Sequence, residues 1–182
     1  MRSARSVGTA LLASLSAAVA TAGDTTGLRT ASERFYQTYL KTKAAGVPVG
    51  DDLARYRAVV SSGLAALLER AGAAEAEYAR RTRNESPPLV EGDLFTSLFE
   101  GASRYLVEGC QPKAPGGTCR VALTYLDRAG GKPVEWTDTV VLVKESGGWR
   151  VSDIEFGGTW EFMHAGRLVG LLESVIAAGQ GP

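Results

Sequence analysis

The sequence predicts a single α+β domain in which helices come first, an antiparallel sheet follows and one helix closes the chain. Three observations predict this class. Apolar residues recur at helical spacing up to residue 83, β-rich runs separated by short turns fill residues 102–156, and a helical apolar face returns at residues 166–178. The length of 182 residues, 45% of them hydrophobic, is enough for one core-bearing domain and short for two.

The first 22 residues have the three parts of a secretory signal peptide. Arg2 and Arg5 are basic, residues 7–20 carry no charge and are rich in Ala and Leu, and small residues stand at Ala20 and Ala22. We therefore expect cleavage near Ala22 and a periplasmic or secreted mature chain, with an uncleaved N-terminal anchor as the alternative. Cleavage removes two basic residues and no acidic one, so the net charge falls from zero to −2.

The rest of the chain shows no second targeting feature. We expect residues 23–30 to form a flexible N-terminus and residues 179–182 to form a frayed tail. The uncharged run at residues 7–20 is too short to span a bilayer comfortably, and no other stretch approaches 18 apolar residues. The sequence therefore predicts no transmembrane segment.

Composition excludes several classes of protein. Lys plus Arg equals Asp plus Glu at 20 each, so the basic surplus that is usual in nucleic-acid binders is missing. One His and two Cys are too few for most His-rich or Cys-rich metal sites. No G-x-G-x-x-G, Walker, zinc-protease or G-x-S-x-G pattern occurs. We therefore expect no metal, no cofactor and no nucleic-acid partner.

Two helical regions precede the predicted sheet. Residues 31–46 carry an aromatic stripe at helical spacing that we expect to pack in the core. Residues 51–83 are helical with a break, at which Ser61 and Ser62 offer a second N-cap before a new apolar face. Asp51 or Asp52 is the expected cap of the first piece.

The second half of the chain reads as strands. A turn at Gly92-Asp93 is expected to start a short helical turn capped by Asp93. At least four strands follow, joined by short connections as in a meander. The predicted strands are residues 102–108, 120–126, 136–144 and 149–156. In the last of these, the apolar residues change face near Ser152, which indicates a bulge or two partly covered faces.

Cys110 and Cys119 are the only cysteines, and an exported chain meets an oxidising compartment. The segment between them is rich in Pro and Gly and lies between two strand-like runs. We therefore predict a disulfide that closes the open end of a hairpin. A redox-active pair is the alternative, although the usual C-x-x-C spacing is absent.

Three strings in the second half carry a resemblance to a known family: PPLVEGDLFTSLFEG (87–101), TYLD (124–127) and EWTDTVVLVKESGGWRVSDIEFGG (135–158). With the helices before them, they resemble the bacterial exported proteins grouped as domain of unknown function 3828, in the nuclear transport factor 2-like (cystatin-like) superfamily. The resemblance implies a cone-like α+β domain over residues 31–178, with helices packed on a strongly curved antiparallel sheet. It implies no reaction, because that superfamily includes isomerases, dehydratases, binding modules, and immunity or delivery proteins.

This chain departs from the family in two respects. It lacks the lipid-bearing Cys of the lipoprotein branches, and its closing helix is not part of the minimal cone.

Two carboxylates are candidates for acid–base catalysis. Asp153 lies in the last predicted strand, and if it faced an apolar interior its pKa would rise into the range of a general base. Glu100 stands beside Gly101 at a strand start and has no evident structural task. Tyr105 or His164 would serve as the proton donor. The structural alternatives are an Asp153 that binds an Arg or a backbone group and a His164 that lies at the surface or at the entry of a helix.

Four residues are candidates for lining a ligand pocket: Arg104, Tyr105, Trp136 and Trp160. Core packing of the tryptophans and a salt bridge of Arg104 within the sheet are the alternatives.

The leading functional hypothesis is an exported, non-enzymatic module that binds a small molecule or an envelope protein, as a monomer or as a homodimer. An isomerase- or dehydratase-like enzyme and an immunity or toxin-neutralising protein remain alternatives. Whether the cone is hollow or filled separates these hypotheses.

Overall fold

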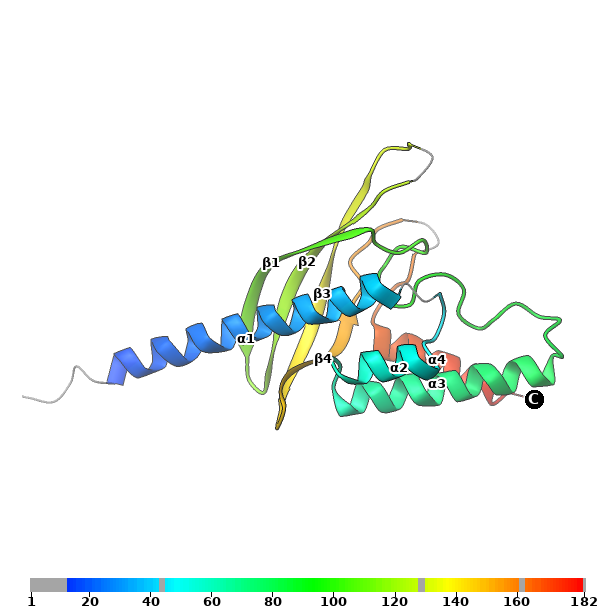
Figure 1. Ribbon diagram of the computed structural model, residues 1–182, viewed down its shortest axis with the longest axis horizontal. Helices are drawn as coiled ribbons and strands as arrows, with labels where there is room; N and C mark the ends of the chain where they lie inside the picture. The colour runs from blue at the N-terminus through cyan, green and yellow to red at the C-terminus, as the bar shows by residue number, and fades with distance from the viewer. Residues whose placement is uncertain (1–12, 43–44, 128–129, 161–162, 182) are drawn as a thin grey trace, which may run out of the picture.

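The computed structural model describes residues 13–42, 45–127, 130–160 and 163–181, with side chains from Asp24 onward. Arg2, Arg5 and the first part of the uncharged run lie outside the described residues. The predicted α+β class is confirmed: α1 crosses a four-stranded antiparallel sheet, and α2, α3 and α4 lie together beside it (Figure 1). The elements are α1 (Ala13–Thr42), α2 (Gly50–Arg57), α3 (Ser62–Arg81), β1 (Arg104–Lys113), β2 (Gly116–Tyr125), β3 (Val134–Glu145), β4 (Gly148–Glu155) and α4 (Leu168–Gly179).

Residues 23–30 are helical, so the expectation of a flexible N-terminus there was wrong. The cause is packing on the sheet. Leu28 is fully buried, and its methyl groups approach Gly117 so closely that a Cβ there would come within 2.6 Å of them. Gly27 lies equally close to the indole of Trp149. The face of α1 that packs on the sheet therefore reaches back at least to Gly27, whereas the sequence pattern placed the start of the helix at residue 31.

The predicted break between α2 and α3 is confirmed. The Ser61 hydroxyl accepts a hydrogen bond from the backbone N–H of Leu64 at 3.2 Å, which is an N-cap. Asp51 and Asp52 lie in the first turn of α2 without capping it, because Val49 occupies the cap position. The linker between the two helices forms a single β-bridge, from Val60 to Val151 of β4. This bridge covers part of the outer edge of β4.

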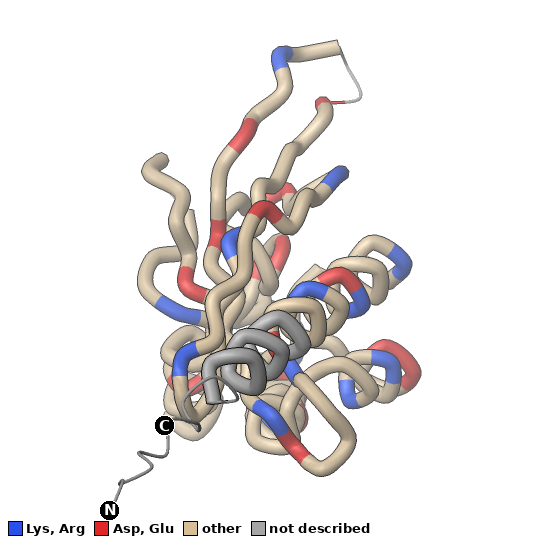
Figure 2. Tube along the Cα trace, turned by 90° about the vertical axis from the view of Figure 1, so that its left-hand side faces the viewer, with Lys and Arg blue, Asp and Glu red and all other residues tan. Residues whose placement is uncertain are grey.

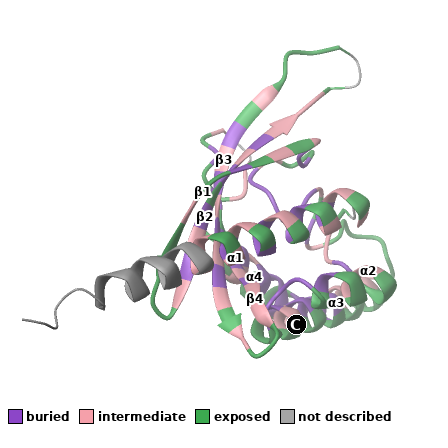
Figure 3. Cartoon of the chain, turned by 60° about the vertical axis from the view of Figure 1, so that its left-hand side comes forward, coloured by how far each residue is buried: buried purple, intermediate pink, exposed green. Residues whose placement is uncertain are grey.

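The sheet is the predicted meander, in the order β1-β2-β3-β4. Buried and partly exposed positions alternate along β3 (Figure 3), and the buried positions of β2 and β3 are cross-strand partners. The predicted irregularity at Ser152 is a bulge, because Val141 pairs with Asp153 while the next residue of β3 pairs with Val151. The bulge turns Asp153 toward the buried side.

The disulfide Cys110–Cys119 is confirmed, with an S–S distance of 2.03 Å. The two cysteines are cross-strand partners, and the strands continue past them to Lys113 and Gly116. The disulfide therefore lies inside the hairpin near its turn and not at an open end, because most of the Pro- and Gly-rich segment pairs as strand. Only the tight turn at Ala114-Pro115 remains unpaired.

The segment from residue 87 to residue 101 is irregular, so the expected helical turn after Asp93 is absent. Asp93 instead accepts a hydrogen bond from the backbone N–H of Phe95 at 2.9 Å, which forms an Asx turn. The segment is anchored on β3 by the buried Asp138. Its carboxylate accepts from the Ser97 backbone N–H at 3.0 Å, from the Ser97 hydroxyl and from the Gly157 N–H at 2.9 Å.

Aromatic side chains fill the space between α1, the sheet and the segment at residues 87–101. Phe35, Tyr36, Tyr56 and Phe95 are at most 1% exposed, and neighbouring ring centroids lie 4.4–5.9 Å apart. The predicted core role of the aromatic stripe is confirmed. Side chains therefore fill the part of the interior that lies beneath α1.

Candidate functional site

A cleft of about 460 Å³ opens where the C-terminal end of α1 meets the segment before β1 and the end of β2. We call it the acidic cleft. Its lining residues are Tyr39, Ala45, Gly92, Asp93, Phe99, Glu100, Ala102, Ser103, Tyr125, Leu126 and Asp127. Among the described residues of this lining are three carboxylates and three aromatic rings, and no Lys or Arg.

Asp93 and Tyr39 form the floor of the acidic cleft. The Tyr39 hydroxyl accepts a hydrogen bond from the Ala102 backbone N–H at 2.7 Å and donates one to the Asp93 carboxylate. Burial raises the pKa of Asp93 to about 6, although hydrogen bonds from Tyr39, Thr96 and the Phe95 N–H oppose the rise. Burial, and then the nearby Asp93, raise the pKa of Tyr39 as well. The pair therefore places an ionisable carboxyl group at the base of a cleft.

Gly101 makes this floor possible. Its φ of +75° is a conformation that L side chains rarely adopt, and a Cβ at this position would lie 2.5 Å from the Tyr39 hydroxyl oxygen and 2.8 Å from Asp93 Oδ2. Gly101 therefore lets the chain turn into β1 while the phenol and the carboxylate remain in contact beneath it.

The rim of the acidic cleft is exposed and has an acidic and aromatic character. Glu100 is exposed, and the ring of Phe99 is 49% exposed even though it is a large apolar side chain. Tyr125 and Asp127 close the opposite wall, from the end of β2. Elsewhere in the described part of the chain, charged residues of both signs are interspersed (Figure 2), whereas the described lining of this cleft is acidic. Carboxylates beside aromatic faces favour a ligand with a positive charge.

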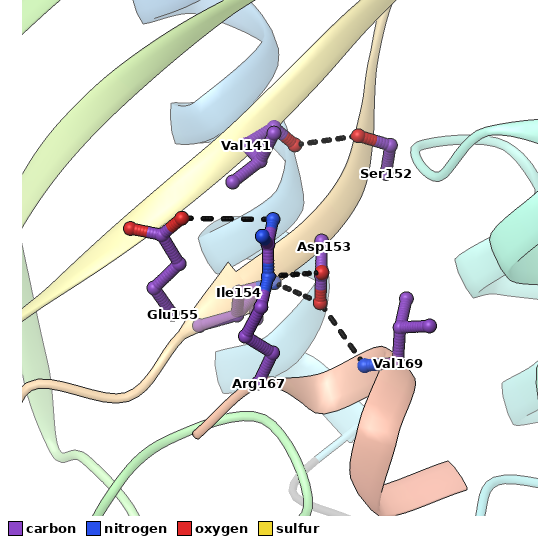
Figure 4. A network of polar contacts seen from close by, with 7 residues as sticks. All are labelled: Val141, Ser152, Asp153, Ile154, Glu155, Arg167 and Val169. Carbon is purple, nitrogen blue, oxygen red and sulfur yellow. Dashed lines mark hydrogen bonds and ion pairs between the residues drawn. The ribbon is translucent and has the colours of Figure 1, made fainter. Parts of the chain in front are cut away.

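Asp153, the first predicted catalytic residue, lies on another part of the molecule. Its carboxylate accepts hydrogen bonds from Arg167 Nε at 2.7 Å and from the Val169 and Ile154 backbone N–H groups at 3.0 and 2.8 Å (Figure 4). Val169 stands in the first turn of α4, so Asp153 caps that helix from β4. Arg167 also reaches Glu155 at 3.6 Å. Asp153 therefore has the structural role that the sequence analysis gave as its alternative, since it binds an Arg and backbone groups.

Glu100, the second predicted catalytic residue, lines the acidic cleft but is not joined by either expected donor. The Tyr105 ring stacks on Tyr36 at 5.2 Å, and its hydroxyl donates to the Glu33 carbonyl at 3.3 Å. His164 Nε2 lies 2.6 Å from the Asp93 carbonyl oxygen, so it contacts the backbone of the floor and not its carboxylate. Neither predicted base, Asp153 or Glu100, therefore has a hydrogen bond with either predicted donor, Tyr105 or His164, among the contacts described.

The predicted pocket residues are divided between two places. Arg104, Tyr105 and Trp136 border an open depression of about 510 Å³ on β1, β2 and β3. The indole of Trp136 is buried, donates from Nε1 to Asp138 at 3.1 Å and meets the Trp160 ring edge-on at 5.6 Å. Trp160 belongs to this packing and not to the border of the depression.

Sequence reasoning treated Asp93 only as a cap and so missed its place on the cleft floor. The signal available in the sequence was the pair of glycines, Gly92 and Gly101, near the two ends of the segment that contains Asp93. In the structure both adopt positive φ and bring the chain back on itself. Among the described residues, no group of three or more His, Cys, Asp or Glu side chains is arranged to hold a metal ion. No helix within the described ranges is long and apolar enough to cross a membrane.

No family model, curated protein or solved structure matches this chain. The resemblance to the exported family therefore remains a prediction that rests on the three strings quoted above.

Proposed function

We propose that this protein is an exported, non-enzymatic binding module and that its ligand is a small organic cation held in the acidic cleft. One observation carries the proposal: the acidic cleft has a buried ionisable carboxyl at its floor and acidic and aromatic side chains at its rim, and the described residues that line it include no Lys or Arg. A cation placed there gains Coulombic attraction from the carboxylates and contact with aromatic faces.

Two further features support the binding role. Asp153 is occupied by the cap of α4, and Glu100 lacks the expected donors, so neither has the partners of an acid–base residue. The aromatic core packs beneath α1, and the acidic cleft opens beside it. Export is supported by the signal-like leader and by the disulfide, which is a bond typical of oxidising compartments.

The binding proposal is tested by calorimetric titration of the purified mature chain with benzylammonium, which combines a cation with a ring. We expect saturable binding that weakens about threefold in Glu100→Gln, because one exposed charge contact of the cation is lost. Glu108→Gln, on β1 outside the acidic cleft, is the matched control and should bind as the wild type does. Absence of binding to the wild type, or equal weakening in both variants, would contradict the proposal.

The export proposal has a separate test. N-terminal sequencing of the protein recovered from the periplasm or medium of a bacterial host should give Gly23 as the first residue. Recovery of the chain only from the cytoplasm, with its first 22 residues intact, would contradict export.

One observation favours a second function, an isomerase- or dehydratase-like enzyme with Asp93 as its base. A cleft carboxyl with a pKa of about 6 is suited to accept a proton near neutral pH. A wild-type-catalysed exchange of the acidic C–H of a small ketone in deuterated water, lost in Asp93→Asn and kept in Glu100→Gln, would support this reading. Cation binding without any exchange over a panel of such ketones would exclude it in favour of the binding module.

A further inference from the structure

A second cleft, of opposite charge, lies between α1 and α2. Its volume is about 570 Å³, and its lining includes three cationic side chains, Arg34 and Lys41 from α1 and Arg55 from α2. The described residues that line it include no carboxylate. We call this cleft the basic groove. It lies on a different face of α1 from Tyr39, so it is separate from the acidic cleft.

The positions along α1 explain how the charges gather. Arg34 and Lys41 are seven residues apart, which is two helical turns, so both side chains rise from one face of the helix at a spacing of about 10 Å. Thr38 lies between them on the same face and also lines the groove. Arg55 approaches from the opposite wall, because α2 packs against α1.

The ion pairs of these residues leave most of the positive charge uncompensated. Arg55 forms an ion pair with Asp52 at 2.8 Å. Neither Arg34 nor Lys41 forms an ion pair with any acidic residue in the part of the chain that the structure describes. Arg34 and Lys41 are both exposed, so an anion that lies between them can meet both positive charges.

The lining of the basic groove also contains uncharged residues. The polar Gln37 and Thr38 come from α1, and Ala58 and the buried Val59 follow α2. An oxyanion group can meet the guanidinium and ammonium groups at the rim, while the carbon frame of the same ligand covers Val59. Arg binds carboxylate and phosphate oxygens through paired N–H donors, and Lys supplies a point charge.

We propose that the basic groove binds a small soluble compound that carries several carboxylate or phosphate groups. Charge complementarity and the volume of the groove select this occupant. The inference is independent of the acidic cleft, so each can hold without the other.

The test is calorimetric titration of the mature chain with citrate and with inorganic phosphate at low ionic strength. We expect citrate to bind, and its dissociation constant to rise about tenfold in the double variant Arg34→Gln/Lys41→Gln, since two charge contacts are lost. Raising the NaCl concentration should weaken the binding, because the groups are exposed to solvent. The matched control is Arg80→Gln/Arg120→Gln, which removes two exposed arginines outside the groove and should leave citrate binding within twofold.

Three results would overturn the proposal. The first is a wild-type protein that binds neither citrate nor phosphate. The second is equal weakening in the groove and control variants, which would indicate attraction by overall charge. The third is flotation with phosphatidylglycerol vesicles that depends on Arg34 and Lys41 while citrate does not bind, which would assign the groove to a lipid surface.

Discussion

The protonation of Asp93 makes the stability of this protein depend on pH in an unusual direction. The carboxyl is 8% exposed, and its pKa rises from 3.8 to about 6 on folding. The native state therefore holds a proton between about pH 4 and pH 6 that the unfolded state has released. Stability is fully present below the unfolded pKa and is lost as the pH rises through the folded pKa. A shift of about two units corresponds to about 3 kcal/mol of unfolding free energy.

The perturbation that isolates this contribution is Asp93→Asn, which keeps the shape of the side chain and cannot titrate. Urea unfolding of the disulfide-bonded protein should be measured from pH 4 to pH 7.5 for wild type and variant. Between these limits the wild type should lose about 2.4 kcal/mol more than the variant, because the unfolded carboxyl is already partly ionised at pH 4 and all other groups titrate equally in both proteins. Glu100→Gln changes the net charge equally at the exposed rim and should keep the wild-type slope.

Two results would refute this reasoning. A difference between wild type and Asp93→Asn that stays constant with pH would show that Asp93 titrates at its ordinary pKa. A wild type that gains stability relative to the variant as the pH rises would show that hydrogen bonds to the carboxylate outweigh its burial.

Three further predictions concern the parts that hold the fold and the acidic cleft. Asp153→Ala should lower the unfolding free energy by about 2 kcal/mol, because the first turn of α4 loses its acceptor, whereas Glu155→Ala should change it by about 0.5 kcal/mol or less; urea unfolding measures both. Gly101→Ala should lower the unfolding free energy clearly more than Gly130→Ala, for which a loss of about 1 kcal/mol is expected. Both glycines have positive φ, but only Gly101 has atoms within 3 Å of the added Cβ. Equal losses of thermal stability in the two variants would refute the contact argument. Replacing both Cys110 and Cys119 by Ser should cost about 2.7 kcal/mol of unfolding free energy, the loop entropy of a closure of about 10 residues, and an unchanged urea midpoint would contradict this.

The sheet could be predicted from the sequence because its strands and turns are signalled locally. Alternating Val, Leu and Thr marked β2 and β3, Gly-containing turns marked the connections, and the change of apolar face at Ser152 marked the bulge in β4. The Ser61 cap was likewise readable, since a cap needs only residues three positions apart.

The features that sequence reasoning missed depend on contacts distant in the chain. The helical state of residues 23–30 depends on Leu28 packing at Gly117, which local composition does not encode. The task of Asp153 depends on the return of Arg167 and α4 to the end of β4. The acidic cleft depends on Tyr39 meeting Asp93 across more than fifty residues. In each case the residue itself could be singled out in the sequence, but the distant residue that it contacts could not be identified.

The most direct test of the proposed cation site is the pKa of Asp93, followed through its side-chain carboxyl carbon by NMR with and without saturating benzylammonium. A pKa of about 6 in the free protein should fall by at least one unit with the cation bound, because a positive charge in the acidic cleft stabilises the carboxylate. A pKa close to 3.8 in the free protein, or a raised pKa that the cation leaves unchanged, would contradict the account.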